Sequence, residues 1–304
     1  QLAQGVNAFI GAASSGVSLT VIDKITTIGV VQLSPANTAA NLTTYEDNGL
    51  YFRNAPSDVL QGAVLAGKAI DAGIANMATI ARPDPYGEGL AAAVVKDFTA
   101  AGGNITSALL YDPAAPSFEA EVAEIVAGAP EAVVVVGFDE STKLIQEMIK
   151  QGAGPDKIQL YLVDGNASTT AFAEFPAGTM AGTVATFPSG SVDVQTFNDR
   201  MLAFDPSLTD FLYGPQSFDV TMLIALAAQQ AGCADGTSIA ANLISGAGDG
   251  GEECTTYADC VALIDAGTAI DYMGVNGGSD FNQYGDLLEG TISINEYTSN
   301  TEYE

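Results

Sequence analysis

Two polar loops near the start of the chain carry residues that could hold an anion. The first, Gly-Ala-Ala-Ser-Ser-Gly at 11–16, follows an apolar segment and opens a predicted helix, so backbone N–H groups and two hydroxyls gather at one place. The second, Ser-Pro-Ala-Asn-Thr at 34–38, ends the next predicted strand. Both loops also have a purely structural interpretation: Ser15 would satisfy its own helix start, and 35–37 would form a Pro-Asn turn.

The first loop has the G-x-x-x-x-G spacing of a phosphate loop, but Val17 and Ser18 stand where the lysine and its neighbour belong. The chain also contains no histidine, so it lacks the commonest general base and metal ligand. Ser14 and Ser15 are candidate nucleophiles for a hydrolase or transferase, yet no G-x-S-x-G sequence surrounds them. We therefore expect a binding protein, not an enzyme, with no cofactor and no metal.

The three cysteines are Cys233, Cys254 and Cys260. Three thiols without histidine make a poor tetrahedral zinc site. We expect one disulfide, and with it an oxidising compartment. Cys254 and Cys260 lie in a polar stretch and could close a small loop, but the sequence does not decide which two pair. The third thiol is expected to be buried.

The charge balance excludes several classes of partner. Nine Lys and Arg against 37 Asp and Glu give a net charge of −28. Nucleic acid is excluded, because binding to a phosphate backbone requires clustered cations, and an anionic membrane surface is disfavoured for the same reason. The excess acid indicates a solvated surface, as in proteins that work in salty water. No run of about 18 apolar residues is present, so no membrane span is expected.

The elements that must position the two loops alternate between strand and helix. Predicted strands lie at 8–11, 30–33, 75–80, 107–111, 132–136 and 159–163, and predicted helices at 15–27, 58–72, 86–101, 118–127 and 140–151. The Ala-Val-Val-Val-Val run at 132–136 is typical of a parallel strand buried on both faces. Beyond 188 helices dominate, at 194–203, 214–231, 238–244 and 257–265, before a polar tail with short strands at 280–297. This alternation predicts an α/β fold whose parallel sheets carry helices on both sides.

Several segments together carry a family resemblance. They are residues 6–11, Ser-Ser-Gly at 14–16, Ser-Pro-Ala-Asn-Thr at 34–38, Phe-Arg-Asn-Ala-Pro-Ser-Asp-x-x-Gln-Gly at 52–62, Tyr-Gly-Glu-Gly-Leu at 86–90 and Ser-Phe-Asp at 217–219. In order and spacing the chain resembles, over nearly its whole length, the leucine/isoleucine/valine-binding protein family. These are the type I periplasmic substrate-binding proteins of branched-chain amino-acid ABC transporters.

The resemblance implies a fold. It implies two doubly wound parallel-sheet lobes joined by a multi-strand hinge, with lobe I formed by 1–57 plus 189–277 and lobe II by 58–188 plus 278–304. Family members begin with a further strand, helix and strand, which this chain lacks. We expect that unit upstream of Gln1, together with a signal segment; a lipoprotein anchor could lie there too.

The resemblance also implies ligand-binding residues. On lobe I, Ser15, Ala36 and Thr38 match positions that hold the α-carboxylate and amino group of a ligand. Asp164 matches the acid that accepts the ammonium, although an Asp-Gly turn would also place an aspartate there.

The remaining positions surround the ligand. Asp58 matches an acid at the hinge-side mouth, and its alternative is a helix N-cap. Tyr86 and Phe138 match lobe II residues that close over the ligand; Phe138 replaces a frequent Tyr and makes the pocket more apolar, unless it is only core packing. Tyr213 aligns across a length difference.

The implied function is that of a periplasmic or extracellular, cell-surface-associated protein. It would capture a small amino acid, branched-chain or otherwise aliphatic, between its lobes and deliver it to an ABC transporter permease. The alternative is a sensor or binding protein of the same fold for an amide, urea or another small polar solute. Asp164 separates the two, because an ammonium ligand needs its charge and a neutral amide does not.

Overall fold

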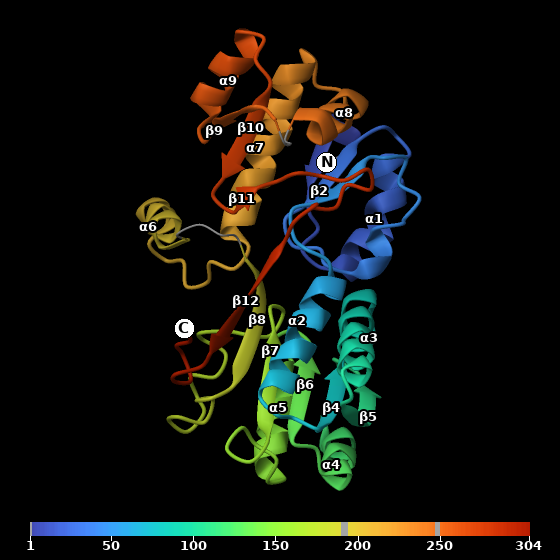
Figure 1. Cartoon of the computed structure of the whole chain (residues 1–304), viewed down its shortest axis with the longest axis vertical. Coiled ribbons are helices and arrows are strands. Elements are labelled where there is room, and N and C mark those ends of the chain that lie inside the picture. Colours follow the sequence, from blue (N-terminus) through green and yellow to red (C-terminus); the bar gives the residue numbers. More distant parts are fainter. Residues whose placement is uncertain (1, 190–193, 247–249) are drawn as a thin grey trace. The chain divides into compact units, whose positions relative to one another are not determined.

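The computed structural model describes residues 2–189, 194–246 and 250–304. The chain forms two compact units (Figure 1). Unit 1 consists of Gln1–Ser57 and Ser189–Thr291, and unit 2 of Asp58–Pro188 and Ile292–Glu304. The chain passes between the units after residues 57, 188 and 291, and the proposed lobe boundaries were after 57, 188 and 277. The third differs, because residues 278–291 belong to unit 1.

Specific contacts fasten that segment to unit 1. The backbone N–H of Arg53 donates to the carbonyl of Gly285 at 2.9 Å, and the Arg53 Nε forms an ion pair with Asp286 Oδ1 at 2.6 Å. The Ser279 hydroxyl donates to Asn54 Oδ1 at 3.0 Å. These partners lie more than 200 residues apart in the chain, which is why the polar composition of the tail did not reveal the boundary.

Unit 2 is built on a six-stranded sheet of order β12-β8-β7-β6-β4-β5. Its strands are β4 (Asn76–Ala81), β5 (Asn104–Leu110), β6 (Ala132–Val136), β7 (Gln159–Val163), β8 (Val184–Ser189) and β12 (Thr291–Glu296). The pairings from β5 through β4, β6 and β7 to β8 are all parallel. Strand β8 was not predicted from the sequence.

Helices cover both faces of this sheet, as the buried run at 132–136 predicted. They are α2 (Asp58–Asp71), α3 (Pro85–Ala100), α4 (Glu119–Gly128) and α5 (Ser141–Lys150). Successive strand residues point to opposite faces. Val134 therefore packs in one core with Leu65 of α2 and Leu90 of α3, whereas Val133 packs in another with Val122 of α4 and Leu144 of α5. The doubly wound α/β prediction is confirmed for this unit.

Unit 1 contains two small sheets. The first has the parallel order β1-β2-β3, with β1 (Ala8–Ile10), β2 (Val31–Ser34) and β3 (Tyr51–Arg53). Helix α1 (Ser15–Thr26) packs Ile22 against Tyr51. Helices α7 (Gly214–Ala231) and α8 (Gly236–Gly246) share a core with Leu33 and Phe52. Short 3-10 helices span Leu2–Gln4 and Ala40–Leu42, and α6 spans Val194–Phe204.

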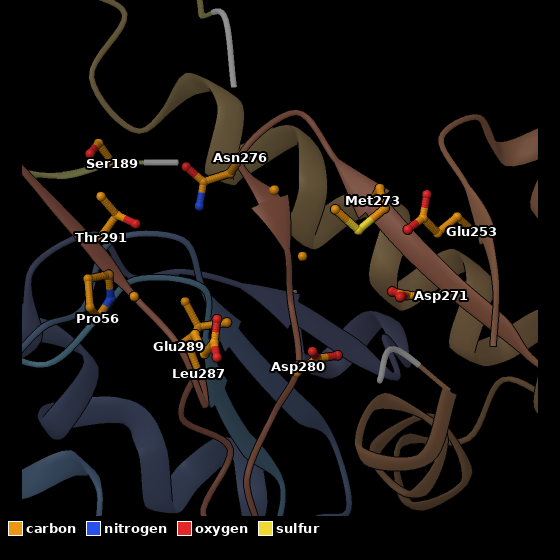
Figure 2. A pocket seen from close by; sticks show the side chains of 13 residues that line it. Pro56, Ser189, Glu253, Asp271, Met273, Asn276, Asp280, Leu287, Glu289 and Thr291 are labelled. Carbon is orange, nitrogen blue, oxygen red and sulfur yellow. The ribbon is translucent and has the colours of Figure 1, made fainter. Parts of the chain in front are cut away.

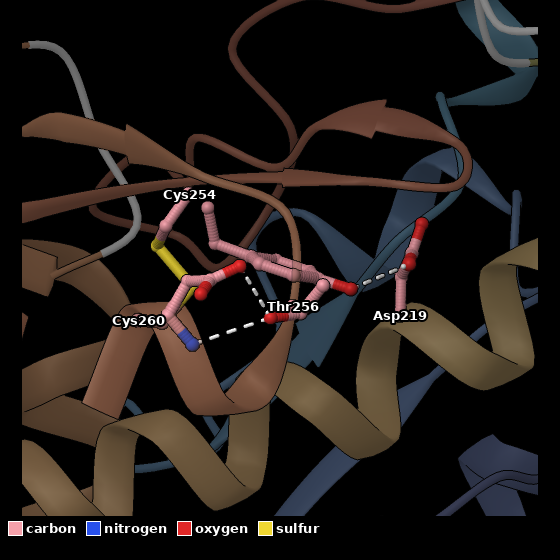
Figure 3. Close-up of a disulfide and its surroundings, with 6 residues drawn as sticks. Asp219, Cys254, Thr256 and Cys260 are labelled. Carbon is pink, nitrogen blue, oxygen red and sulfur yellow. Dashed lines mark hydrogen bonds between the residues drawn. A yellow bond between two sulfur atoms is a disulfide. The ribbon is translucent and has the colours of Figure 1, made fainter. Parts of the chain in front are cut away.

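The second sheet has the order β11-β10-β9 and was not predicted. It consists of β9 (Glu252–Cys254), β10 (Ile270–Gly274) and β11 (Gly277–Gly278), with α9 (Tyr257–Asp265) between the first two. Cys254 of β9 and Cys260 of α9 form a disulfide (Figure 3). Cys233 is exposed, which corrects the expectation of a buried third thiol. It follows Gly232, whose left-handed backbone ends α7, and its thiol donates to Asp235 Oδ2 at 3.3 Å.

A buried carboxylate braces this second sheet. Asp219 of α7 accepts hydrogen bonds from the Tyr272 hydroxyl at 3.1 Å and from the backbone N–H groups of Val275 and Asn276 at 2.9 and 2.6 Å. Figure 3 shows the tyrosine bond. A Cβ on Gly274 would lie 2.5 Å from the carboxylate, so glycine is required there. Burial raises the pKa of Asp219, although these three donors oppose the shift. None of the described helices combines the length and apolar character needed to cross a bilayer.

Candidate functional site

The two polar loops predicted in unit 1 meet at Ser15. This serine begins α1 and is buried, and its hydroxyl oxygen accepts hydrogen bonds from the backbone N–H groups of Thr38 at 3.3 Å and Ala39 at 3.2 Å. A hydroxyl that accepts two bonds still has its own hydrogen to donate. Ser15 thus bridges the loops at 11–16 and 34–38.

The backbone at 11–13 is held by polar side chains of β2 and the loop after it. The carbonyl of Ala12 accepts from the Ser34 hydroxyl at 2.7 Å and from Asn37 Nδ2 at 3.1 Å. Gln32 Nε2 donates to the carbonyl of Gly11 at 2.9 Å. The backbone N–H of Ala36 donates to Ser34 Oγ at 3.2 Å. In this structure the Ala36 N–H is therefore engaged within the loop.

Tyr213 lies at the start of α7 with a left-handed backbone (φ 59°) and is half-buried. Its carbonyl accepts bonds from the Ser217 N–H and hydroxyl at 2.9 and 2.7 Å. A role for its ring in ligand binding stays a prediction.

In unit 2 the predicted residues gather around Asp164, which directly follows β7. Its Oδ1 accepts hydrogen bonds from Gln61 Nε2 at 2.9 Å and from the Tyr86 hydroxyl at 3.1 Å. The Tyr86 oxygen in turn accepts from the backbone N–H of Gly165 at 3.3 Å. A Cβ on Gly165 would lie 2.6 Å from the Gly137 carbonyl and 2.8 Å from the Tyr86 oxygen, so the close approach requires glycine. Asp164 is 5% exposed.

Aromatic rings adjoin this carboxylate. Tyr86 and Phe138 stack with ring centroids 5.5 Å apart and an interplanar angle of 5°. The guanidinium carbon of Arg82 lies 4.0 Å from the Phe138 centroid, within cation–π range. Arg82 is held by ion pairs with Asp84 and, at 2.9 Å, Glu140. Phe138 is half-buried and also packs against the core of α2 and α3, and its role in closing over a ligand stays a prediction.

Asp58 begins α2 and is fully buried. It lies one helical turn before Gln61, which sequence reasoning did not single out as a site residue. Gln61 Nε2 also donates to the carbonyl and hydroxyl of Thr186, both at 3.1 Å. The i, i+3 spacing of Asp58 and Gln61 on the buried face of an amphipathic helix was the available signal. Arg82, directly after β4, was missed as well.

A separate acidic pocket of about 430 Å³ lies within unit 1 (Figure 2). Its carboxylates are Glu253 of β9, Asp271 of β10, Asp280 and Glu289. None of the predicted binding residues lines it, and like charge disfavours an anionic ligand there. Among the described residues, no group of three or more His, Cys, Asp or Glu is placed to hold a metal ion.

Comparison with known proteins places the chain in a family. Residues 1–300 match the family model described as the receptor family ligand binding region. The chain is 29% identical over 244 residues to Leu/Ile/Val-binding protein homolog 1 of Brucella abortus, covering 78% of this chain and 64% of that protein. It is 30% identical over 155 residues to an uncharacterized protein of Methanocaldococcus jannaschii, covering 48% of this chain and 37% of that protein. The chain thus spans less than two thirds of either relative.

Solved structures share the fold. A leucine-binding protein, LivK, from Thermotoga maritima superposes with a TM-score of 0.80 at 18% identity, covering 99% of this chain and 79% of that one. A solute-binding protein of an ABC transporter from Rhodopseudomonas palustris, in complex with benzoate, superposes with a TM-score of 0.76 at 16% identity. The match covers 97% of this chain and 75% of that one. The predicted resemblance to leucine/isoleucine/valine-binding proteins is confirmed. The chain belongs to the family that is described as "receptor family ligand binding region". Its fold is that of the type I periplasmic binding proteins.

Proposed function

We propose that the protein is an extracytoplasmic solute-binding protein that captures a small amino acid, branched-chain or otherwise aliphatic, and delivers it to an ABC transporter permease. The observation that carries this proposal is the Asp164 carboxylate, nearly buried at the end of a parallel strand and held by Gln61 and Tyr86. In open α/β sheets, ligands bind beyond the carboxyl ends of the strands. A carboxylate at that position suits the ammonium group of an amino acid.

The α-carboxylate of the ligand is assigned to unit 1. The Ser15 hydroxyl retains a hydrogen to donate, and it contacts the backbone N–H of Thr38, the last residue of the second loop. Hydrogen bonds to a charged acceptor are about twice as strong as neutral ones, so hydroxyl and backbone donors can hold a carboxylate without a buried arginine. Ala36 and Tyr213 remain proposed neighbours of the ligand in this unit.

The side chain of the ligand is assigned to the aromatic pair. The stacked rings of Tyr86 and Phe138 offer an apolar surface beside Asp164. Aliphatic groups gain free energy by covering such a surface, at roughly 25 cal/mol per Å² removed from water. Asp58, buried at the start of α2, remains a proposed neighbour of the ligand in unit 2.

The second candidate is a ligand without an ammonium group. The benzoate complex of a structural neighbour shows that this fold also accepts a plain carboxylate. An amide, urea or another small polar solute is the other ligand of this class. Asp164 argues against a plain carboxylate here, because two like charges in a poorly hydrated place repel.

Calorimetric titration of the intact chain tests the proposal. The panel is L-leucine, L-isoleucine, L-valine, benzoate, acetamide and urea, at one ionic strength. We expect at least one of the amino acids to bind and the other three solutes to bind much more weakly. Failure of all three amino acids to bind, with the chain shown to be folded by circular dichroism, would contradict the proposal; binding of benzoate or urea alone would favour the second candidate.

A further inference from the structure

Arg53, at the end of β3, is the largest fully buried side chain in the described part of the protein. Each of its three guanidinium nitrogens donates to a different residue. Nε donates to Asp286 Oδ1 at 2.6 Å, Nη1 to the carbonyl of Ala39 at 2.9 Å, and Nη2 to the Thr43 hydroxyl at 2.8 Å. A buried arginine whose three nitrogens each donate a hydrogen bond inside the protein has a positional role as well as a charge to neutralise.

The ion pair is closed by a third residue. The Thr43 hydroxyl donates to Asp286 Oδ2 at 2.6 Å, so the carboxylate uses both of its oxygens in the network. Removing one partner of such a pair strands a buried charge, whereas the intact pair contributes little net stability. The network therefore serves to hold the backbone in place more than to raise the free energy of unfolding.

The backbone that the network holds is that of Ala39, the residue next to Thr38. The Ala39 carbonyl is held by Arg53, and the Ala39 N–H is held by Ser15 Oγ at 3.2 Å, beside the Thr38 N–H at 3.3 Å. The backbone at 38–39 is thus clamped from both sides, by α1 through Ser15 and by β3 through Arg53. These bonds fix the backbone from which the Thr38 side chain projects.

We propose that Arg53 and Asp286 are positioning residues that fix the backbone at 38–39, and through it Thr38, for ligand binding, without touching the ligand. The consequence for affinity rests on the proposed function; the consequence for the loop does not. Asp286 belongs to the segment that precedes the last crossing into unit 2. The C-terminal part of unit 1 therefore takes part in shaping a loop formed by its N-terminal part.

Hydrogen exchange measured amide by amide, together with calorimetry, tests this on the full chain. The variants are Asp286→Asn, Arg53→Lys and the milder Thr43→Val, which keeps both charges and removes only the bridging hydroxyl. We expect exchange of the Thr38 and Ala39 amides to accelerate about tenfold or more, and the affinity for the amino acid that binds the unaltered chain to fall by a similar factor. Arg53→Lys keeps the positive charge, yet it should show the same faster exchange and weaker binding, because an ammonium cannot reproduce the planar geometry of the guanidinium donors.

The matched control is Tyr272→Phe. It removes another buried hydrogen bond of unit 1, the one to Asp219, with no link to residues 38–39. It should lower the free energy of unfolding while leaving the exchange rates of both amides and the affinity for the amino acid unchanged. Unchanged exchange at 38 and 39 in folded Thr43→Val and Asp286→Asn would overturn the proposal, as would an affinity loss no larger than that of the control. If the unaltered chain binds no amino acid, yet hydrogen exchange of the two amides is still faster in the variants, the proposed function fails and the positioning role stands.

Discussion

The Tyr86 hydroxyl donates to Asp164 Oδ1 at 3.1 Å while its oxygen accepts the Gly165 N–H at 3.3 Å. Tyr86 belongs to α3 and Asp164 follows β7, so one hydroxyl ties a helix to the end of a strand. Gln61 of α2 donates to the same carboxylate oxygen. The orientation of Asp164 is thus set from two helices, which is the arrangement that a preorganised binding carboxylate requires.

Asp164→Asn should weaken binding of an amino acid by about 5- to 150-fold, or about 1–3 kcal/mol, because the ammonium loses its charged partner. A neutral amide should lose much less. The dissociation constants come from calorimetry. Asp156→Asn, at an exposed position of the same unit, is the control and should change neither. Equal losses for an amino acid and for a neutral solute would contradict the assignment of Asp164 to the ammonium.

Tyr86→Phe should weaken binding by about 2- to 12-fold, or about 0.5–1.5 kcal/mol. This is less than the roughly 1.5–3 kcal/mol of a hydrogen bond to a charged group, because Gln61 still orients the carboxylate. The variant keeps the ring that stacks on Phe138 and removes only the hydroxyl that orients Asp164. Tyr161→Phe is a suitable comparison, since Tyr161 is a buried tyrosine in the same core. We expect that second variant to bind normally. An unchanged affinity in Tyr86→Phe would show that Gln61 alone orients the carboxylate.

Replacing both Cys254 and Cys260 by alanine should lower the free energy of unfolding by about 2 kcal/mol, the chain-entropy effect of opening so short a loop. Urea unfolding with and without a reducing agent measures it. Cys233→Ala should leave stability unchanged, because that thiol is exposed and outside the disulfide. Equal stability of the oxidised and reduced chain would contradict this expectation.

Asp219 should contribute to the free energy of unfolding in a way that depends on pH. Burial raises its pKa in the folded state, so the folded chain binds this proton more tightly than the unfolded chain does. The resulting stabilisation is complete below the unfolded pKa of about 3.9 and is lost as pH rises through the higher folded value. The difference in unfolding free energy between the unaltered chain and Asp219→Asn should therefore fall as pH rises above about 3.9. A difference that grows with pH would contradict the raised pKa.

Local patterns in the sequence predicted most of unit 2. The buried run at 132–136 and the apolar periodicity of 58–72 and 86–101 appear as β6, α2 and α3 within a few residues. Those signals are short-range, because each arises from the period of one strand or one helix. The sheet of β9, β10 and β11 carried no such signal: its strands are two to five residues long, and only their pairing defines them.

The sequence by itself determined the alternating α/β order, the absence of histidine and the two polar loops after strands. Through the family resemblance it also proposed Ser15, Thr38, Tyr86 and Asp164 as binding residues. Only the tertiary structure decided that Gln61 orients Asp164, and that Arg53 reaches Asp286 across 233 positions of chain. Such partners have no fixed spacing in the sequence, because they meet only after separate elements have packed against a common core.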